Sequence, residues 1–416
     1  MTTAESRVNL REELIFLLNQ ATELEHSLCC SYLFTAFTLK SKVEDGLPEA
    51  AIPVVKGWKD TFVSIAIEEM FHLTLINDLL VGLGAAPNFD RPNFPHGCSY
   101  YMPEVHIELH PFSEETMRHF VAIEQPTGGN LPFRRNPELR IGVHGARTNE
   151  IGPDAFILQS QGDVYDLVLE GLDAMKERIG EDKLFIGPPT SPALERFLTG
   201  SGWEVMRTVE AAKRNLARIV EEGEGGHADS ANSHHARFTA ILYEYLRLKD
   251  EYPGIEPAFP VLDNPFARTP PEVSGALNFN VLHDEFAVQV SDLFNVVYTT
   301  MLNLLARFFI VDTETDQQAG TLMNTSMMVM GRALAPLGEL LVRLPAGEGH
   351  PNNTAGPSFV VGTMHPLPYK ESAWFVLQER FNELAEYATK LSEKNDEAKP
   401  LLSVGQNLGR VAKMLR

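Results

Sequence analysis

The sequence predicts a mainly α-helical protein built around a four-helix bundle. Long stretches without proline or glycine carry apolar residues at alternating spacings of three and four, which is typical of helices that bury one face. Several of these apolar stripes are interrupted by a glutamate or a histidine, and only one short region alternates in the manner of a strand. A chain of 416 residues has room for a bundle and a second helical region.

The first helix is expected from Asn9 to about Lys40. Asn9 followed by Glu12 is a capping arrangement, and no proline or glycine interrupts the segment that follows. The inward stripe of this helix consists of Leu14, Leu18, Ala21, Glu25, Leu28 and Tyr32. Glu25 is therefore expected to be buried.

The second helix is expected from Val54 to Leu83, ending at Gly84 before Pro87. Its inward stripe consists of Trp58, Phe62, Ile65, Glu69, His72, Ile76, Leu79 and Leu83. The pattern therefore directs both polar residues of a Glu-x-x-His pair, Glu69 and His72, into the core.

The region from about 85 to 190 is expected to be a partly β insertion between the second and third helices. Alternating Val105, Ile107 and Leu109 indicate a short strand pair. Helical patterns return at Glu114 to Ile123 and at Val164 to Ile179.

The third and fourth helices are expected at Pro192 to Glu222 and at Ala231 to Leu248. The main stripe of the third helix has no acid, but its C-terminal end has three. We expect Glu224 to turn inward, with Glu221 as the competing candidate. The stripe of the fourth helix places His234 on its inner face.

The bundle is expected to span residues 9 to 250, and residues 251 to 416 to form an additional C-terminal helical region packed on it. This region shows helical patterns at Phe286 to Phe309, Gln317 to Leu344 and Ser372 to Leu391. The most apolar stretch, Phe286 to Val311, contains five polar residues that hydrocarbon would leave unpaired, so we expect a core helix and no membrane association.

The inward acids and histidines predict a metal site. A lone ionised carboxylate in an apolar core costs several kcal/mol, so it must be protonated, paired or bound to a metal. Bundles hold two metals with one carboxylate on one helix and a Glu-x-x-His pair on the next, and such donors suit iron or manganese. The predicted ligands are Glu25, Glu69, His72, His234 and either Glu224 or Glu221. A buried hydrogen-bonded ion network is the alternative interpretation.

Tyr32 lies one heptad after Glu25. It is a candidate catalytic residue, because it is placed to bond a metal ligand or to take part in redox chemistry. An ordinary buried tyrosine is an equally good interpretation.

The composition restricts the partners and the compartment. The 56 acidic and 35 basic residues give a net charge of −21, which repels nucleic acid and anionic lipid. Three cysteines, including the adjacent Cys29 and Cys30, do not form a disulfide framework and favour a reducing compartment. The first residues lack the features of a signal peptide, so we expect a cytoplasmic protein.

Short motifs of the sequence resemble the ferritin-like domain of the iminophenyl-pyruvate dimer synthases of violacein and rebeccamycin biosynthesis. The matching motifs are Leu24-Glu25-His26 with Tyr32, Ile65 to His72, Gly84-Ala85-Ala86-Pro87, Gly223-Glu224-Gly225, and Ser233-His234 with Arg237-Phe238. The resemblance is tight over about residues 9 to 250 and looser beyond. It implies a ferritin-like four-helix bundle and an oxidative role on amino-acid-derived metabolites. The large additional N-terminal domain of those enzymes has no counterpart, so imine coupling itself is not implied.

The sequence departs from ordinary ferritin-like enzymes at one position. A second Glu-x-x-His would need an acid where Ala231 stands, so the site is one carboxylate short unless Asp229 or Glu244 supplies it. The remaining set is similar to that of dimanganese catalases.

The expected function is that of a diiron oxidase or oxygenase that uses dioxygen on a small substrate in secondary metabolism. Peroxide disproportionation by manganese, and a non-enzymatic iron-binding or scaffold role, are the alternatives. A homodimer is left open.

Overall fold

The computed structural model describes residues 8, 10–97, 106–125, 161–223, 231–268, 279–310, 314–362, 364, 367–394 and 396–416. Regular structure in these residues is almost entirely helical, which confirms the predicted fold class. The strands are two-residue segments: β1 (His96–Gly97) pairs antiparallel with β2 (His106–Ile107), and β3 (Pro265–Phe266) pairs parallel with β4 (Asn280–Val281).

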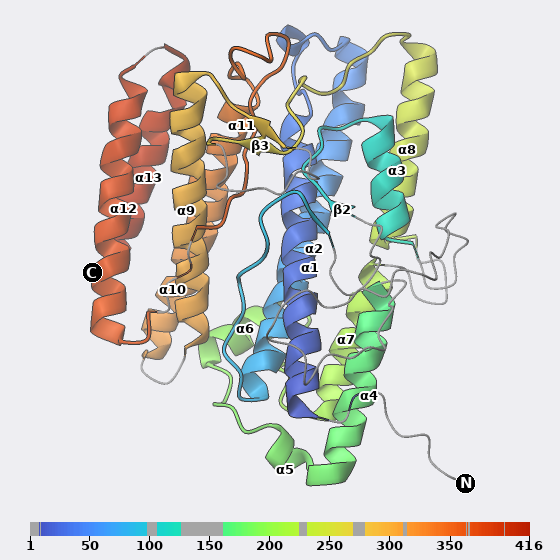
Figure 1. Ribbon diagram of the computed structural model, residues 1–416, viewed down its shortest axis with the longest axis vertical. Coiled ribbons are helices and arrows are strands. Elements are labelled where there is room, and N and C mark those ends of the chain that lie inside the picture. The colour runs from blue at the N-terminus through green and yellow to red at the C-terminus, as the bar shows by residue number, and fades with distance from the viewer. Residues whose placement is uncertain are drawn as a thin grey trace.

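Two long helices, α1 (Arg11–Thr38) and α2 (Ile52–Gly82), run side by side through the centre of the molecule (Figure 1). The inward stripes predicted for these two helices are buried throughout. The carboxylate of Glu13 accepts a hydrogen bond of 3.0 Å from the backbone N–H of Leu10 and closes the first turn of α1. The predicted cap at Asn9 lies outside the described residues.

Four shorter helices complete the bundle in place of two long ones. At one end α3 (Glu114–Ile123) packs on α8 (His234–Glu251), and at the other end α4 (Gln161–Ile179) packs on α7 (Val209–Gly223) (Figure 1). Both α3 and α4 lie between residues 85 and 190. The region expected to be an insertion therefore contributes two helices to this N-terminal bundle.

The third predicted helix is interrupted, which corrects the expectation of one helix from Pro192 to Glu222. It consists of α6 (Pro192–Gly200) and α7, and the short α5 (Glu181–Leu184) precedes them. Gly202 has a φ of 80°, in the left-handed region that favours glycine, and the chain turns there. The turn places the buried Trp203 against the bundle.

The C-terminal part forms a second bundle (Figure 1, orange and red). Its helices are α9 (Glu285–Phe309), α10 (Asp316–Val329), the π-helical turn η3 (Met330–Leu334), α11 (Ala335–Leu341), α12 (Lys370–Ser392) and α13 (Pro400–Met414). Helix α9 contacts α2, and α11 contacts α1. Helix α13 was not predicted.

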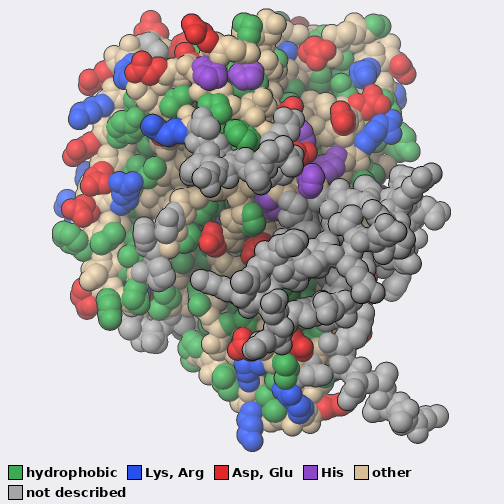
Figure 2. Space-filling view, in the orientation of Figure 1, with side chains coloured by type: hydrophobic (Ala, Val, Ile, Leu, Met, Phe, Trp, Pro, Cys, Tyr) green, Lys and Arg blue, Asp and Glu red, His purple; other side chains and the backbone are tan. Residues whose placement is uncertain are grey.

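Short helical turns fill the connections: η1 (Val43–Asp45) and η2 (Glu49–Ala51) join α1 to α2, and η4 (Asp396–Ala398) precedes α13. Across the described part of the face drawn in Figure 2, acidic and basic side chains are interspersed. Among the described helices, none has both the length and the apolarity needed to cross a membrane.

A buried polar cluster joins the two bundles. His26 of α1 hydrogen-bonds Tyr298 of α9, and the Tyr298 hydroxyl lies 3.1 Å from Cys30 Sγ. The Arg91 guanidinium, 5% exposed, donates to the backbone oxygens of Pro92 at 2.8 Å and Phe359 at 2.5 Å. Arg91 thus ties the loop after α2 to the segment that precedes α12.

Candidate metal centre

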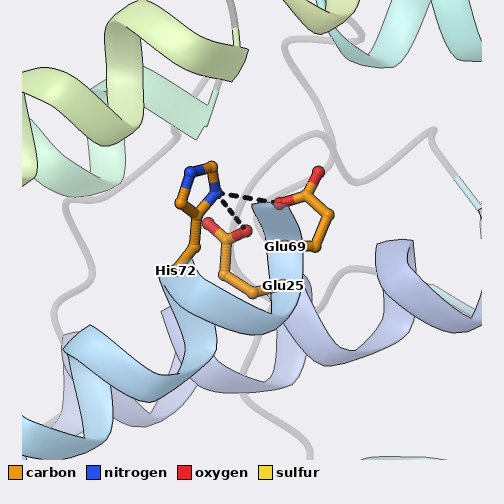
Figure 3. Close-up of side chains that lie close together, drawn as sticks. All are labelled: Glu25, Glu69 and His72. Carbon is orange, nitrogen blue, oxygen red and sulfur yellow. Dashed lines mark hydrogen bonds and ion pairs between the residues drawn. The ribbon is translucent and has the colours of Figure 1, made fainter. Parts of the chain in front are cut away.

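Glu25, Glu69 and His72 meet in the core of the N-terminal bundle (Figure 3). Each is 1% exposed. His72 Nδ1 lies 2.9 Å from Glu69 Oε2 and 3.4 Å from Glu25 Oε2. The four-three spacing of the stripes on α1 and α2 places these side chains together, as the sequence predicts.

A second group consists of Glu69, Glu124 and His234. Glu124 and His234 are both 0% exposed. Glu124 follows the last residue of α3, and His234 is the first residue of α8, where Ser233 caps the helix by accepting from the Ala236 N–H at 3.1 Å. In this second group a glutamate and a histidine come from the ends of two shorter helices. In the first group the glutamate and the histidine, Glu25 and His72, lie within long helices.

Glu69 belongs to both groups. One of its oxygens, Oε2, faces His72, and the other, Oε1, lies 3.1 Å from His234 Nδ1. The two imidazole rings have centroids 5.8 Å apart. Glu69 is thus positioned as a carboxylate that could bridge two metal ions, each with one histidine and one further glutamate.

Several donor atoms of the two groups lie close to other polar atoms but lack a hydrogen bond of good geometry within the described residues. They are Glu25 Oε2, Glu69 Oε1, Glu124 Oε2 and His234 Nδ1. A buried polar atom left without a partner costs about 1–3 kcal/mol. Because the unpaired atoms are the nitrogen and oxygens that would ligate a cation, the donor set fits a pair of metal ions.

The pKa values of the cluster reflect strong mutual interaction. Burial, reinforced by the negative charge of Glu69, raises the pKa of Glu25 to about 8. Burial would lower the pKa of His72, but the nearby carboxylates of Glu222, Glu25 and Glu69 outweigh this and raise the pKa well above its usual value. Without metal, this core therefore favours a protonated Glu25 and a charged His72.

The other ligands follow the same physical logic. Burial would raise the pKa of Glu69, but the charge of His234 and its hydrogen bonds hold it well below the usual range. For His234, burial would lower the pKa, but Glu69 and Glu124 raise it well above normal. A metal ion would therefore displace protons from the imidazoles.

The two outer glutamates, Glu25 and Glu124, each belong to only one of the two groups. Each accepts a hydrogen bond from a tyrosine. Tyr165 of α4 donates to Glu25 Oε1, and Tyr32 of α1 donates to Glu124 Oε1. Burial raises the pKa of both tyrosines well above normal. Each phenol therefore keeps its proton and fixes one carboxylate oxygen, leaving the other for a metal.

Of the two acids predicted at the end of the third helix, only Glu221 lies among the described residues. Glu221 is exposed, and Glu224 lies outside the described residues. The acid that faces the core is Glu222, whose Oε2 lies 3.1 Å from His72 Nε2. Glu222 contacts the outer nitrogen of the ring and not the two metal-facing groups.

Glu124 is placed where it could supply the carboxylate that the sequence left missing. Of the two residues proposed to fill the gap, Glu244 accepts a hydrogen bond from Trp58 Nε1 at 2.8 Å, and Asp229 lies outside the described residues. A signal was present: Met117, Phe120 and Glu124 follow the same three-four spacing, but the predicted helix ended at Ile123, one residue before Glu124.

Comparison with known proteins agrees with this architecture. A family model described as ferritin-like matches residues 18–243, more than half of the chain. A curated relative from Chromobacterium violaceum, 2-imino-3-(indol-3-yl)propanoate dimerase, is 27% identical over 85% of this chain and 34% of its own length. Dichlorochromopyrrolate synthase from Lentzea aerocolonigenes is 24% identical over 93% of this chain and 40% of its own length.

The chain thus spans 34% to 40% of the length of these curated relatives. Among solved structures, a ferritin-like protein from Caulobacter vibrioides aligns with a TM-score of 0.45 and 14% identity, covering 73% of this chain and 88% of that one. The motifs that suggested the resemblance lie within the matched region. The chain therefore belongs to the ferritin-like family.

Proposed function

We propose that this protein is a non-haem diiron enzyme that uses dioxygen to oxidise a small amino-acid-derived metabolite in secondary metabolism. The observation that carries the proposal is the pair of buried acid and histidine groups that share Glu69. Free, buried Cys29 and Cys30 support a reducing compartment such as the cytoplasm.

In this proposal Glu25 and His72 hold one metal ion, Glu124 and His234 hold the other, and Glu69 lies between them. When bound, a pair of Fe(II) ions would supply two of the electrons with which dioxygen is reduced, and the substrate would supply the others. Three carboxylates against two divalent ions leave little uncompensated charge in a core that excludes water. Full burial of all five side chains protects the site from bulk solvent.

The tyrosines have a specific part in the proposal. Tyr165 and Tyr32 each occupy one oxygen of an outer glutamate, so that Glu25 and Glu124 each offer a single oxygen to the metal. Tyr32, the candidate catalytic residue of the sequence, is one hydrogen bond away from a proposed ligand. Tyr165 is likewise one hydrogen bond away from Glu25, a proposed ligand of the other metal ion.

The names of the relatives support the substrate class. One is named a dimerase of 2-imino-3-(indol-3-yl)propanoate and the other a synthase of dichlorochromopyrrolate, so both names indicate small nitrogen-containing metabolites. We extend this chemistry to the present chain as a class and not as a particular compound.

Metal analysis tests the proposal. The purified protein, loaded anaerobically with Fe(II) and desalted, should carry about two metal ions per chain by mass spectrometry. Glu69→Ala removes the residue shared by both groups and should reduce the content to near zero. Glu221→Ala, an exposed acid on α7, is the matched control and should keep two. A Glu69→Ala variant that still held two metal ions would refute the site.

Manganese is the competing metal, because oxygen and imidazole ligands suit both. Protein produced with both metals supplied equally should contain iron and consume dioxygen when an imine, formed from an aromatic amino acid by an amino-acid oxidase, is added. Manganese content with rapid peroxide disproportionation and no imine-dependent dioxygen uptake would favour the catalase-like function. Two bound irons with neither activity would favour iron binding or a scaffold role.

A further inference from the structure

Each proposed histidine ligand has a charged pair behind it. For His72 the pair is Glu222 and Arg218, both on α7. His72 Nε2 lies 3.1 Å from Glu222 Oε2, and Arg218 Nε donates to Glu222 Oε1 at 2.8 Å. The Arg218 guanidinium also lies 3.7 Å from the centre of the Trp203 ring, whose plane is almost perpendicular to that of His72.

The second histidine has the same arrangement from different elements. His234 Nε2 lies 3.0 Å from Glu68 Oε2. Arg237, one turn further along α8, contacts both oxygens of Glu68, and Ser64 donates to Glu68 Oε1 at 3.2 Å. Glu68 immediately precedes the shared Glu69, so one turn of α2 serves both His234 nitrogens.

These contacts fix which nitrogen of each ring faces the metal groups. An ionised carboxylate only accepts hydrogen bonds, so Nε2 of each ring carries a hydrogen. The lone pair of Nδ1 can then be directed at Glu69 and the proposed metal position. Both Nδ1 atoms do face Glu69, at 2.9 Å for His72 and 3.1 Å for His234.

The pairs also adjust the charge behind each ring. A carboxylate that accepts from Nε2–H makes the imidazole a stronger electron donor, because it stabilises positive charge on the ring. An arginine on that carboxylate offsets part of its negative charge. The two residues of each pair therefore act in opposite directions on the same histidine.

We infer that Glu222 with Arg218, and Glu68 with Arg237, are positioning residues that orient the two histidines and balance the donor strength of the metal pair. The inference rests on the proposed metal site and deepens it. Neither glutamate belongs to the two groups that would hold metal. The two pairs come from different helices, yet they reproduce the same three-member chain behind each half of the site.

The test compares charge-removing variants of both members of a pair in the full chain. Glu222→Gln and Glu68→Gln should each weaken anaerobic Co(II) binding, followed by its visible absorption, by about 10- to 100-fold at one of the two sites. In the iron-loaded protein these variants should raise the midpoint potential, because they remove negative charge that stabilises the oxidised metal. Arg218→Met and Arg237→Met should lower the potential, and Arg→Lys at either position should restore it.

Opposite signs within one pair separate this role from mere loss of packing, which would weaken binding in all four variants alike. Glu221→Gln, one residue from Glu222 and exposed, should leave both affinity and potential unchanged. Shifts of the same sign for Glu222→Gln and Arg218→Met, or no shift in either, would overturn the inference. A wild-type chain that binds no metal would instead overturn the proposed function on which the inference rests.

Discussion

At the scale of single residues, the centre depends on where acids end helices as much as on where they lie along them. Glu25 and Glu69 occupy stripe positions in long helices, and their burial was predicted from spacing alone. Glu124 and Glu222 lie at helix ends, where one residue of uncertainty in the boundary changes the direction of the side chain. Sequence spacing therefore located Glu69 but missed Glu124, and at the end of the third helix it proposed Glu224 or Glu221 and passed over Glu222.

Removal of Glu124 should separate the two halves of the centre. Glu124→Ala leaves Glu25, Glu69 and His72 in place, so we expect about one metal ion per chain in place of two, measured by mass spectrometry after loading with Fe(II). Glu115→Ala, an exposed acid on the same helix, serves as the control and should retain two. Retention of both ions by Glu124→Ala would show that Glu124 is not a ligand.

At the scale of elements, helices with a continuous apolar stripe could be predicted from the sequence. The prediction failed where two shorter helices take the place of one long helix. The stripes on α1 and α2 are long enough to average out local exceptions. The third helix was predicted as one because its pattern resumes after Gly202, although the glycine turns the chain. Helix α13 lies near the end of the chain, after the last predicted helix, which ends at Leu391.

One ionic contact between connecting segments predicts a pH dependence. His110, after β2, lies 2.9 Å from Glu108 and 2.9 Å from Asp263, which precedes β3. Burial would lower its pKa, but hydrogen bonds to Asp263 and Glu108 raise it to about 9. Because the folded-state pKa exceeds the unfolded value, the stabilisation is complete below about pH 6.5 and is lost as the pH rises through 9.

The His110→Asn variant should therefore unfold at a lower temperature than the wild type at pH 6, and the difference should largely vanish at pH 10. We expect a loss of about 1–2 kcal/mol at pH 6, after allowance for partial solvent screening. Thermal unfolding followed by circular dichroism at both pH values measures this. A difference that is constant between pH 6 and pH 10 would contradict the assignment of the stabilisation to the charged imidazole.

At the scale of the whole molecule, Arg91 joins the two bundles, and the hydrogen bonds described for its guanidinium go to backbone oxygens and the Cys30 sulfur and not to a carboxylate. Its guanidinium donates to two backbone oxygens from segments far apart in the chain and lies 4.1 Å from the centre of the Phe94 ring. Buried carbonyls that lose a donor are costly. This contact could not be predicted from the sequence, because sequence patterns report on side chains and both acceptors are backbone oxygens.

Arg91→Met should lower the free energy of unfolding by about 2–4 kcal/mol, because it leaves the oxygens of Pro92 and Phe359 without this donor. Thermal unfolding measures the loss, with the exposed Arg332→Met as the control. Metal content should stay at the wild-type value, since Arg91 belongs to neither metal-facing group. An unchanged melting temperature would show that the clamp contributes nothing.

Consecutive residues of α1 look in different directions: Glu25 toward the proposed metals and His26 toward Tyr298 of α9. Backbone hydrogen bonds hold each turn of a helix to the next, so a rotation that is applied to one of these faces also moves the other. The C-terminal bundle therefore contacts the helix that carries the proposed ligand Glu25. We expect that removal of that bundle would expose the His26 side of α1 to water and leave Glu25 less firmly placed, so the proposed metal site depends on both bundles.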